Sequence, residues 1–267
     1  MTTPSELLDL ATRIAVTTGD LIARRRAEGV RVAASKSSLE DVVTDADREA
    51  EALIRSLIAE ARPEDGFLGE ESGAEAGTSG LTWVVDPIDG TVNYLYGIRQ
   101  YAVSIAVVEG APEPETWRAL AGVVVNPAAD EVFAASVGGG ATLNGVPIRV
   151  ALPVALSQAL VGTGFGYLAE RRVEQAKVLV GLVAQVRDIR RQGSAALDLC
   201  AIATGRLNAY FERGLKPWDH AAGGLIAAEA GARVSGRGGA SASSEFLLAG
   251  EQSVAAALES VLDELGN

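Results

Sequence analysis

Cysteine and histidine are nearly absent from this sequence, which holds one of each, Cys200 and His220, in 267 residues. One cysteine excludes an intrachain disulfide, which fits a reducing compartment. The shortage also excludes zinc sites that draw on several Cys or His ligands, and covalent phosphatase chemistry through a Cys with an Arg-rich loop or a pair of histidines. We therefore assign Cys200 to the core and no catalytic role to His220, and look for chemistry in carboxylates, hydroxyls and bound ions.

Positive charge and long apolar runs are also scarce. Lys and Arg number 23 against 35 Asp and Glu, a net charge of -12 that argues against nucleic acid as the main ligand. An acidic site that binds phosphate would need cations. Residues 1–26 form an amphipathic pattern, and no stretch of about 18 apolar residues is present to cross a bilayer. We expect a cytoplasmic protein with no membrane segment.

The patterns that are present predict a layered fold. Apolar residues at helical spacing predict helices over residues 4–28 and 46–61, the second capped by Thr44 or Asp45. β-branched or alternating segments predict strands at 82–86, 101–109, 119–125 and 131–135, with a hairpin turn at Asn144-Gly145. After about residue 157, strands at 159–162, 187–190 and 207–211 alternate with helices at 168–185, 194–203, 218–230 and 253–265. We therefore expect an α/β (α+β) layered sandwich, one domain over residues 1–267 whose two subdomains join near 145–157.

The segment Asp86-Pro87-Ile88-Asp89-Gly90-Thr91 places two acids three residues apart after an apolar strand. In a regular strand these acids would face opposite sides, so we expect the strand to stop at Asp86 and to turn through Pro87 and Gly90. The turn would bring both carboxylates and the Ile88 carbonyl together as hard ligands for Mg²⁺, Mn²⁺ or Ca²⁺. A helix that begins at Thr91 would present amides to a phosphate. The same hexapeptide is also a common surface turn, and that alternative stays open here.

Three further acidic groups accompany this segment. Glu70 and Glu71 follow the apolar pair Phe67-Leu68, so a second strand ends in carboxylates, although a solvated loop has the same pattern. Asp41, Asp45 and Asp47 surround Thr44, and Asp219 precedes an apolar run; each of these groups also reads as a helix cap.

The motifs WVVDPIDGTVN, GEES, KSSLEDVVTDAD and WDHAAGGLIAAEAGA together resemble the inositol monophosphatase family of Mg²⁺-dependent, lithium-sensitive phosphatases, in the family's order and at matching separations. The similarity runs from about residue 5 to residue 235. It implies an αβαβα sandwich of the sugar-phosphatase type, a homodimer, two or three Mg²⁺ ions per site with Mn²⁺ as a substitute, and a small phosphorylated polyol or sugar as the substrate.

The resemblance also implies residue roles. The metal ligands would be Glu70, Asp86, the Ile88 carbonyl, Asp89 and Asp219, and water would be the nucleophile. The catalytic group would comprise Glu70, Thr91 and Asp47. Substrate contacts would come from Asp89, Gly90, Thr91, Gly193, Ser194, Ala196, Glu212 and Asp219. Lys36, Asp41 and Thr44 would belong to a supporting loop.

Several alternatives remain at this point. Relatives with the same metal motifs hydrolyse histidinol phosphate, fructose 1,6-bisphosphate or 3'-phosphoadenosine 5'-phosphate, because the pocket walls define the alcohol. The DPIDGT strand end also resembles the aspartyl-phosphate signature of haloacid-dehalogenase phosphatases, but there the two acids are two residues apart. A third alternative is a regulatory binding protein that has kept the fold. Glu212 favours inositol monophosphate, and the choice for Arg190 and Arg191 between ion pairs and substrate contact is open.

Overall fold

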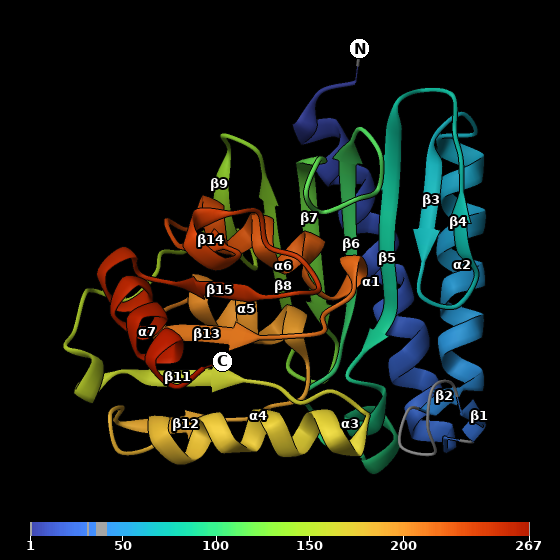
Figure 1. Ribbon diagram of the computed structural model, residues 1–267. Coiled ribbons are helices and arrows are strands. Elements are labelled where there is room, and N and C mark those ends of the chain that lie inside the picture. The colour runs from blue at the N-terminus through green and yellow to red at the C-terminus, as the bar shows by residue number, and fades with distance from the viewer. Residues whose placement is uncertain (1, 31, 36–41, 267) are drawn as a thin grey trace.

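The computed structural model describes residues 2–30, 32–35 and 42–266. Two sheets and three helical layers alternate, so the architecture is the expected αβαβα sandwich (Figure 1). Four buried clusters fill the spaces between the five layers. Lys36 and Asp41, predicted for the supporting loop, lie outside the described residues.

The first outer layer consists of two long helices, α1 (Pro4–Glu28) and α2 (Asp45–Ala61). Thr3 and Glu6 form a capping box that starts α1, and Thr44 and Asp47 form another that starts α2. A short antiparallel ribbon, β1 (Val32–Ser35) and β2 (Val42–Thr44), precedes α2. Both helices therefore occupy the ranges that the sequence predicts. No helix in the described ranges has the length and apolar character to span a membrane.

The larger sheet has eight strands in the order β10-β9-β8-β7-β6-β5-β3-β4. All neighbours pair antiparallel except β3 with β5. The strands are β3 (Gly66–Gly69), β4 (Gly73–Glu75), β5 (Leu81–Asp89), β6 (Ala102–Glu109), β7 (Arg118–Asn126), β8 (Glu131–Ser136), β9 (Gly140–Leu143) and β10 (Val146–Pro147). Asn144 and Gly145 have φ of 50° and 77°, so they form the predicted hairpin turn between β9 and β10.

The smaller sheet has five strands in the order β12-β11-β13-β15-β14, in which β11 is parallel to both β12 and β13. Its strands are β11 (Leu160–Thr163), β12 (Asp188–Arg190), β13 (Ala209–Glu212), β14 (Arg233–Ser235) and β15 (Leu247–Gly250). The sequence reading missed β14 and β15. The single-turn helices η1 (Leu156–Gln158) and η2 (Arg237–Gly239) lie in the connections.

The remaining helices cover both faces of the smaller sheet. Two of them, α5 (Ala195–Ala203) and α6 (Pro217–Glu229), lie between the two sheets. The other two, α4 (Ala169–Leu182) and α7 (Gln252–Glu264), form the second outer layer. A short helix, α3 (Thr91–Tyr96), follows β5 directly. The starts of α3, α5 and α6 therefore come close to the ends of β5, β11 and β13, and this junction positions the site.

Candidate active site

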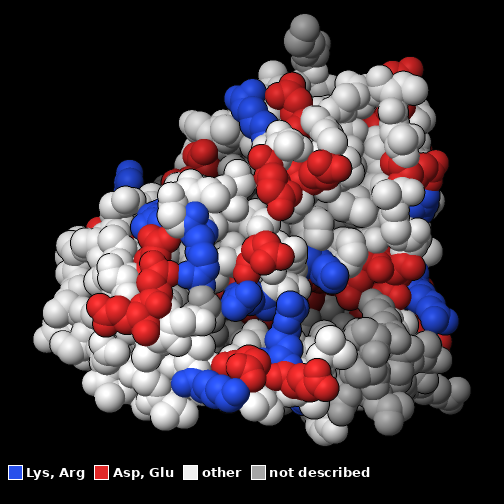
Figure 2. Space-filling model, viewed as in Figure 1, with Lys and Arg blue, Asp and Glu red and all other residues white. Residues whose placement is uncertain are grey.

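A cavity of about 410 Å³ opens where these strand and helix ends meet. Because β11 and β13 are parallel, their carboxyl ends lie at one edge of the sheet, which is where ligands bind in such folds. Figure 2 shows acidic and basic side chains around a hollow near the middle of this face. The acidic lining residues are Glu70, Asp86, Asp89, Asp198, Glu212 and Asp219, and the basic ones are Arg171, Arg191, Arg213 and Lys216.

Asp86 and Asp89 reach the cavity by a route that differs from the prediction. The strand does not stop at Asp86, since β5 continues to Asp89 and contains a bulge between the two acids. Asp86 pairs with Ser104 and Asp89 pairs with Ala102, so three steps on β5 match two steps on β6. Partners two residues apart share a face of a sheet, and the bulge therefore places both aspartates on the same face. The Ile88 amide donates to Asp86 Oδ1 over 3.0 Å.

Gly90 and Thr91 make the turn from β5 into α3. Gly90 has φ of 91°, and a Cβ there would lie 2.7 Å from the Gln100 carbonyl oxygen, so only glycine fits. The Thr91 hydroxyl lies 3.1 Å from Asp47 Oδ1 and 3.0 Å from the Ile88 carbonyl oxygen. It has one proton and donates it to one of these acceptors at a time. The predicted pairing of Thr91 with Asp47 is therefore present.

Asp47 does not line the cavity and acts on it through Thr91. Its other oxygen, Oδ2, accepts hydrogen bonds from the Thr44 amide at 2.8 Å and the Thr44 hydroxyl at 2.5 Å. Burial raises the pKa of Asp47 to about 6, against the lowering effect of these two hydrogen bonds. Thr44 is thus a support for Asp47, as well as the cap of α2.

Asp89 connects the larger sheet to the start of α5. Its Oδ2 accepts a hydrogen bond from the Ser194 hydroxyl at 2.6 Å and another from the Ala196 amide at 2.7 Å. Ser194 also caps α5 by accepting from the Leu197 amide. Gly193 and Ser194 line the cavity, but Ala196 does not, because its amide is directed at Asp89. Ala196 was predicted to bind substrate, and the structure instead places it behind Asp89.

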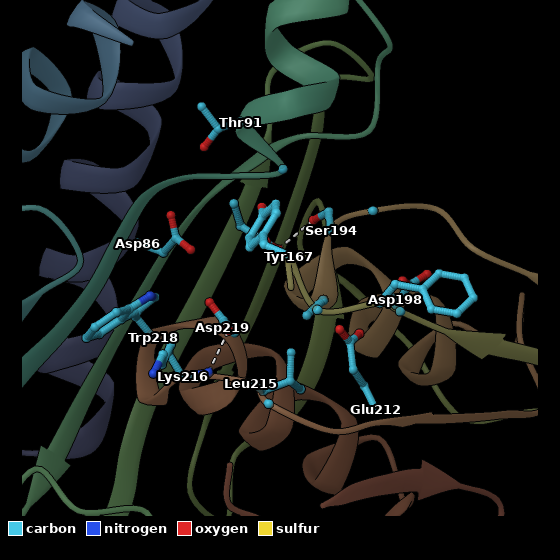
Figure 3. A pocket seen from close by; sticks show the side chains of 18 of the residues that line it. Asp86, Thr91, Tyr167, Ser194, Asp198, Glu212, Leu215, Lys216, Trp218 and Asp219 are labelled. Carbon is cyan, nitrogen blue, oxygen red and sulfur yellow. Dashed lines mark hydrogen bonds between the residues drawn. The ribbon is translucent and has the colours of Figure 1, made fainter. Parts of the chain in front are cut away.

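Asp219 caps a helix and also lines the cavity, two positions that the sequence presented as alternatives. Its Oδ2 accepts from the Lys216 amide at 2.6 Å, so it caps the start of α6. It also lines the cavity, where Figure 3 shows its carboxyl group between Asp86 and Lys216. Glu70 enters the same cavity from the end of β3, where its amide donates to the Val85 carbonyl oxygen at 3.2 Å.

The electrostatics of this group favour a cation. Burial and the negative charges of Glu70, Asp89 and Asp219 raise the pKa of Asp86 well above its ordinary value. Burial also raises the pKa of Asp89 to about 6 and raises the pKa of Asp219 well above its ordinary value. Within the described residues, no Lys or Arg forms an ion pair with Asp86, Asp89 or Asp219. Buried carboxylates without a counter-charge are costly, and a divalent ion would relieve that cost.

The spacing of these acids is looser than the sequence led us to expect. Among the residues that the structure describes, no three His, Cys, Asp or Glu side chains are grouped closely enough to form a ready metal centre. Like charges repel, which is consistent with the distance between these carboxylates. The group fits a divalent cation because its donors are oxygens and its negative charge is not compensated, and not because of its present spacing.

Glu212 and Asp198 lie at the other end of the cavity, away from Asp86 (Figure 3). Glu212 was predicted there, and the Tyr210 hydroxyl donates to its Oε2 at 2.5 Å. Burial raises the pKa of Glu212 to about 7. Asp198 was missed by the sequence reading. The only signal for it is one acid in the apolar run Ala195-Ala196-Leu197-Asp198-Leu199.

Comparison with known proteins identifies the family. A model described as the inositol monophosphatase family matches residues 3–267. This chain belongs to the inositol monophosphatase family. The inositol-1-monophosphatase SuhB of Mycobacterium tuberculosis is 45% identical over 249 residues, which are 86% of this chain and 84% of that protein. The Nus factor SuhB of Vibrio cholerae is 40% identical over 231 residues, 85% of this chain and 84% of that one.

A solved structure agrees with the family assignment. The crystal structure of the extragenic suppressor protein suhB of Bartonella henselae has a TM-score of 0.87 and 34% sequence identity to this chain. The comparison covers 97% of this chain and 98% of that chain. The layered fold expected from the motifs is therefore confirmed.

Most of the residues that the family motifs singled out meet at this cavity. Ten of them line it: Glu70, Asp86, Ile88, Asp89, Gly90, Thr91, Gly193, Ser194, Glu212 and Asp219. His220 is buried against Trp117, and burial lowers its pKa to about 4; it does not line the cavity. Cys200 is buried in the cluster between the larger sheet and the middle helices, as predicted.

Proposed function

We propose that this inositol monophosphatase family member is a Mg²⁺-dependent phosphomonoesterase that hydrolyses inositol 1-phosphate or a closely related polyol or sugar monophosphate. One observation carries the proposal: Asp86 and Asp89 from β5 and Asp219 from α6 line one cavity without a basic partner among the described residues. That is the environment in which carboxylates hold divalent cations.

The residues that would hold Mg²⁺ are Glu70, Asp86, the Ile88 carbonyl, Asp89 and Asp219. Their donors are all oxygens, which suits Mg²⁺ or Mn²⁺ and not the softer metals. When bound, the ions supply Lewis-acid polarisation of the phosphoryl oxygens and lower the pKa of water, which is what the very slow hydrolysis of phosphate monoesters requires.

The protein side chains orient the attacking water and remove its proton. Glu70 would accept a hydrogen bond from the water at the end of β3. Thr91 would hold the same water through the lone pairs of its hydroxyl, while its own proton goes to Asp47. Because Thr44 holds the far oxygen of Asp47, that carboxylate keeps its nearer oxygen directed at Thr91. Thr91 and Asp47 together then form a short path for the proton away from the water.

The alcohol part of the substrate would extend toward Glu212. Asp89 and Asp219 each have one oxygen occupied by a backbone amide, so the other oxygen of each remains for a metal ion or a substrate hydroxyl. Glu212, held by Tyr210, would accept a hydrogen bond from a ring hydroxyl. Acceptors at this end of the cavity favour polyols over plain alkyl phosphates.

The proposal is tested by measuring phosphate release from a panel of phosphate monoesters with the purified protein and Mg²⁺. The panel comprises inositol 1-phosphate, fructose 1,6-bisphosphate, histidinol phosphate and 3'-phosphoadenosine 5'-phosphate. We expect the highest kcat/KM on inositol 1-phosphate and inhibition by lithium. If no compound released phosphate over a full Mg²⁺ titration, the proposed phosphatase activity would be refuted. A stable phosphoaspartate at Asp86 would instead show a covalent mechanism like that of the haloacid-dehalogenase phosphatases, in place of attack by water.

A regulatory role is the second candidate, because a relative that is 40% identical is named Nus factor SuhB. The net charge of -12 disfavours direct binding to nucleic acid, so such a role would work through a protein partner. It is compatible with phosphatase activity. The homodimer expected from the family belongs to this proposal as well, and sedimentation of the purified protein tests it.

A further inference from the structure

Asp198 is a buried acid at the substrate end of the cavity to which the proposed mechanism gives no part. It lies one turn into α5, has a relative exposure of 1% and lines the cavity. Burial, followed by the charge of Glu212, raises its pKa well above the ordinary value. A fully buried carboxyl group lowers the stability of the fold unless other groups form hydrogen bonds with it or balance its charge.

The hydrogen bonds of Asp198 leave one of its oxygens without a donor. The Gln192 side-chain amide donates to Oδ1 at 2.8 Å, which fixes the orientation of the carboxyl group. No residue in the described ranges donates to Oδ2. Since Asp198 lines the cavity, this second oxygen is available to a ligand there.

Glu212 is held rigidly beside it. The Tyr210 hydroxyl donates to Glu212 Oε2 at 2.5 Å, and Tyr210 itself is completely buried. Gly164 provides the space for this carboxyl group, because a Cβ at this position would lie 1.9 Å from Glu212 Oε2. Figure 3 shows the carboxyl groups of Asp198 and Glu212 next to each other at the end of the cavity away from Asp86.

We propose that Asp198 is a specificity-determining residue that accepts a hydrogen bond from a second substrate hydroxyl, next to the hydroxyl bound by Glu212. The pair of acceptors then selects phosphate esters whose alcohol carries two neighbouring hydroxyls. This inference rests on the proposed phosphomonoesterase function and narrows its substrate class. The alternative is that Asp198 is only a favourable acid in the first turn of α5, in which case it stabilises the helix and has no effect on substrate choice.

Asp198→Asn separates these two roles. Gln192 needs an acceptor, so the oxygen of the new amide stays with Gln192 and the NH₂ group replaces the acceptor that faces the cavity. We expect kcat/KM for inositol 1-phosphate to fall about tenfold, as is typical for the loss of one hydrogen bond to the substrate. With ethyl phosphate, which has no second hydroxyl, kcat/KM should stay within about twofold.

Deoxy analogues of inositol 1-phosphate, each lacking one hydroxyl, identify the partner of Asp198. The kcat/KM of the wild-type enzyme should fall about tenfold or more on two of these analogues, whose missing hydroxyls are neighbours on the ring. One of the two hydroxyls would be the partner of Glu212 and the other the partner of Asp198. Asp198→Asn should be insensitive to the loss of one of these two hydroxyls, since the interaction is already gone. Asp9→Asn, an exposed aspartate on α1, is the matched control and should change none of these values.

Each result has a distinct meaning. The proposed role of Asp198 would be overturned if Asp198→Asn lowered kcat/KM equally on inositol 1-phosphate and on ethyl phosphate. It would also be overturned if the effect of the substitution on kcat/KM added to the effect of every missing hydroxyl. If Asp198→Asn does not fold, the wild-type series decides: sensitivity to fewer than two neighbouring hydroxyls overturns the inference. A wild-type enzyme that releases phosphate from neither compound contradicts the phosphomonoesterase itself.

Discussion

Asp89 Oδ2 accepts a hydrogen bond from the Ser194 hydroxyl at 2.6 Å, across 105 residues of sequence. This contact joins the end of β5 in the larger sheet to the cap of α5 between the sheets. A proposed metal ligand and a helix cap thus depend on each other. Both halves of the chain must be folded and packed before Asp89 has its orientation.

Replacing Ser194 by alanine should therefore affect both stability and the site. The substitution removes the hydroxyl that donates to Asp89 and accepts from the Leu197 amide. We expect a loss of about 1 to 2 kcal/mol in the free energy of unfolding and weaker Mg²⁺ binding. Denaturant unfolding and Mg²⁺ titration measure these quantities. Ser253→Ala, at the exposed start of α7, is the control, and unchanged Mg²⁺ affinity in Ser194→Ala would contradict the coupling.

Asp86→Asn should stabilise the metal-free protein. Asparagine retains the oxygen that accepts from the Ile88 amide, and it removes the charge that opposes Glu70, Asp89 and Asp219. We expect the Tm in chelator to equal or exceed that of the wild type, and the rise in Tm on adding Mg²⁺ to shrink. A variant with the full Mg²⁺-dependent rise in Tm would show that Asp86 does not hold the ion.

The stability of the metal-free protein should depend on pH in a specific direction. Burial raises the pKa of Asp47 and of Asp89 to about 6 and that of Glu212 to about 7, from ordinary values of 3.8 for Asp and 4.5 for Glu. At a pH between the unfolded and the folded pKa of such a group, the unfolded chain has lost a proton that the folded chain keeps. The free energy of unfolding therefore falls as the pH rises from about 4.5 to 7. The contribution is about 1.4 kcal/mol per pKa unit for each group, as an upper bound.

Thermal melts in chelator at pH 5, 6 and 7 measure this dependence. We expect Tm to decrease along the series, and Mg²⁺ to reverse the decrease because it favours the ionised carboxylates. His220, whose pKa burial lowers to about 4, opposes this trend below about pH 6.5. A Tm that rises over the whole range would mean that these carboxyl groups are ionised in the folded state without a cation.

Gly164→Ala should change substrate selection without unfolding the protein. The added methyl group would overlap Glu212 Oε2, whose carboxyl group would have to move away from Tyr210. We expect kcat/KM on inositol 1-phosphate to fall about tenfold while activity on ethyl phosphate is retained. Gly224→Ala in α6 is the control, because its nearest neighbour to a new Cβ lies 3.8 Å away, an ordinary contact. Undiminished inositol phosphate hydrolysis by Gly164→Ala would mean that Glu212 does not select substrate.

Local patterns in the sequence were enough to predict most elements, and most of the residues that the family motifs singled out line the cavity. Helical periodicity and caps predicted α1 and α2 to within a residue, because propensity, capping and burial agree there. The short strands β14 and β15 were missed because three or four residues are too few to show an alternating hydrophobic pattern. Their place in the sheet depends on pairing between segments distant in sequence, β15 with β13 and β14 with β15.

Two features of the site required the tertiary structure. The bulge between Asp86 and Asp89 depends on the register with β6, which no pattern within β5 reveals. Asp198 was overlooked because a single acid in an apolar helix has no motif, and its access to the cavity depends on how α5 packs between the sheets. The roles of the metal ligands and the two-subdomain organisation remain predictions.

The most direct test is steady-state phosphate release from inositol 1-phosphate as Mg²⁺ is titrated into metal-free wild-type protein and Asp86→Asn. We predict turnover by the wild type that appears only with Mg²⁺, and turnover by Asp86→Asn that is at least about a hundredfold lower at every Mg²⁺ concentration. Wild-type turnover by Asp86→Asn, or Mg²⁺-independent release by the wild type, would contradict a metal-dependent phosphatase centred on these carboxylates.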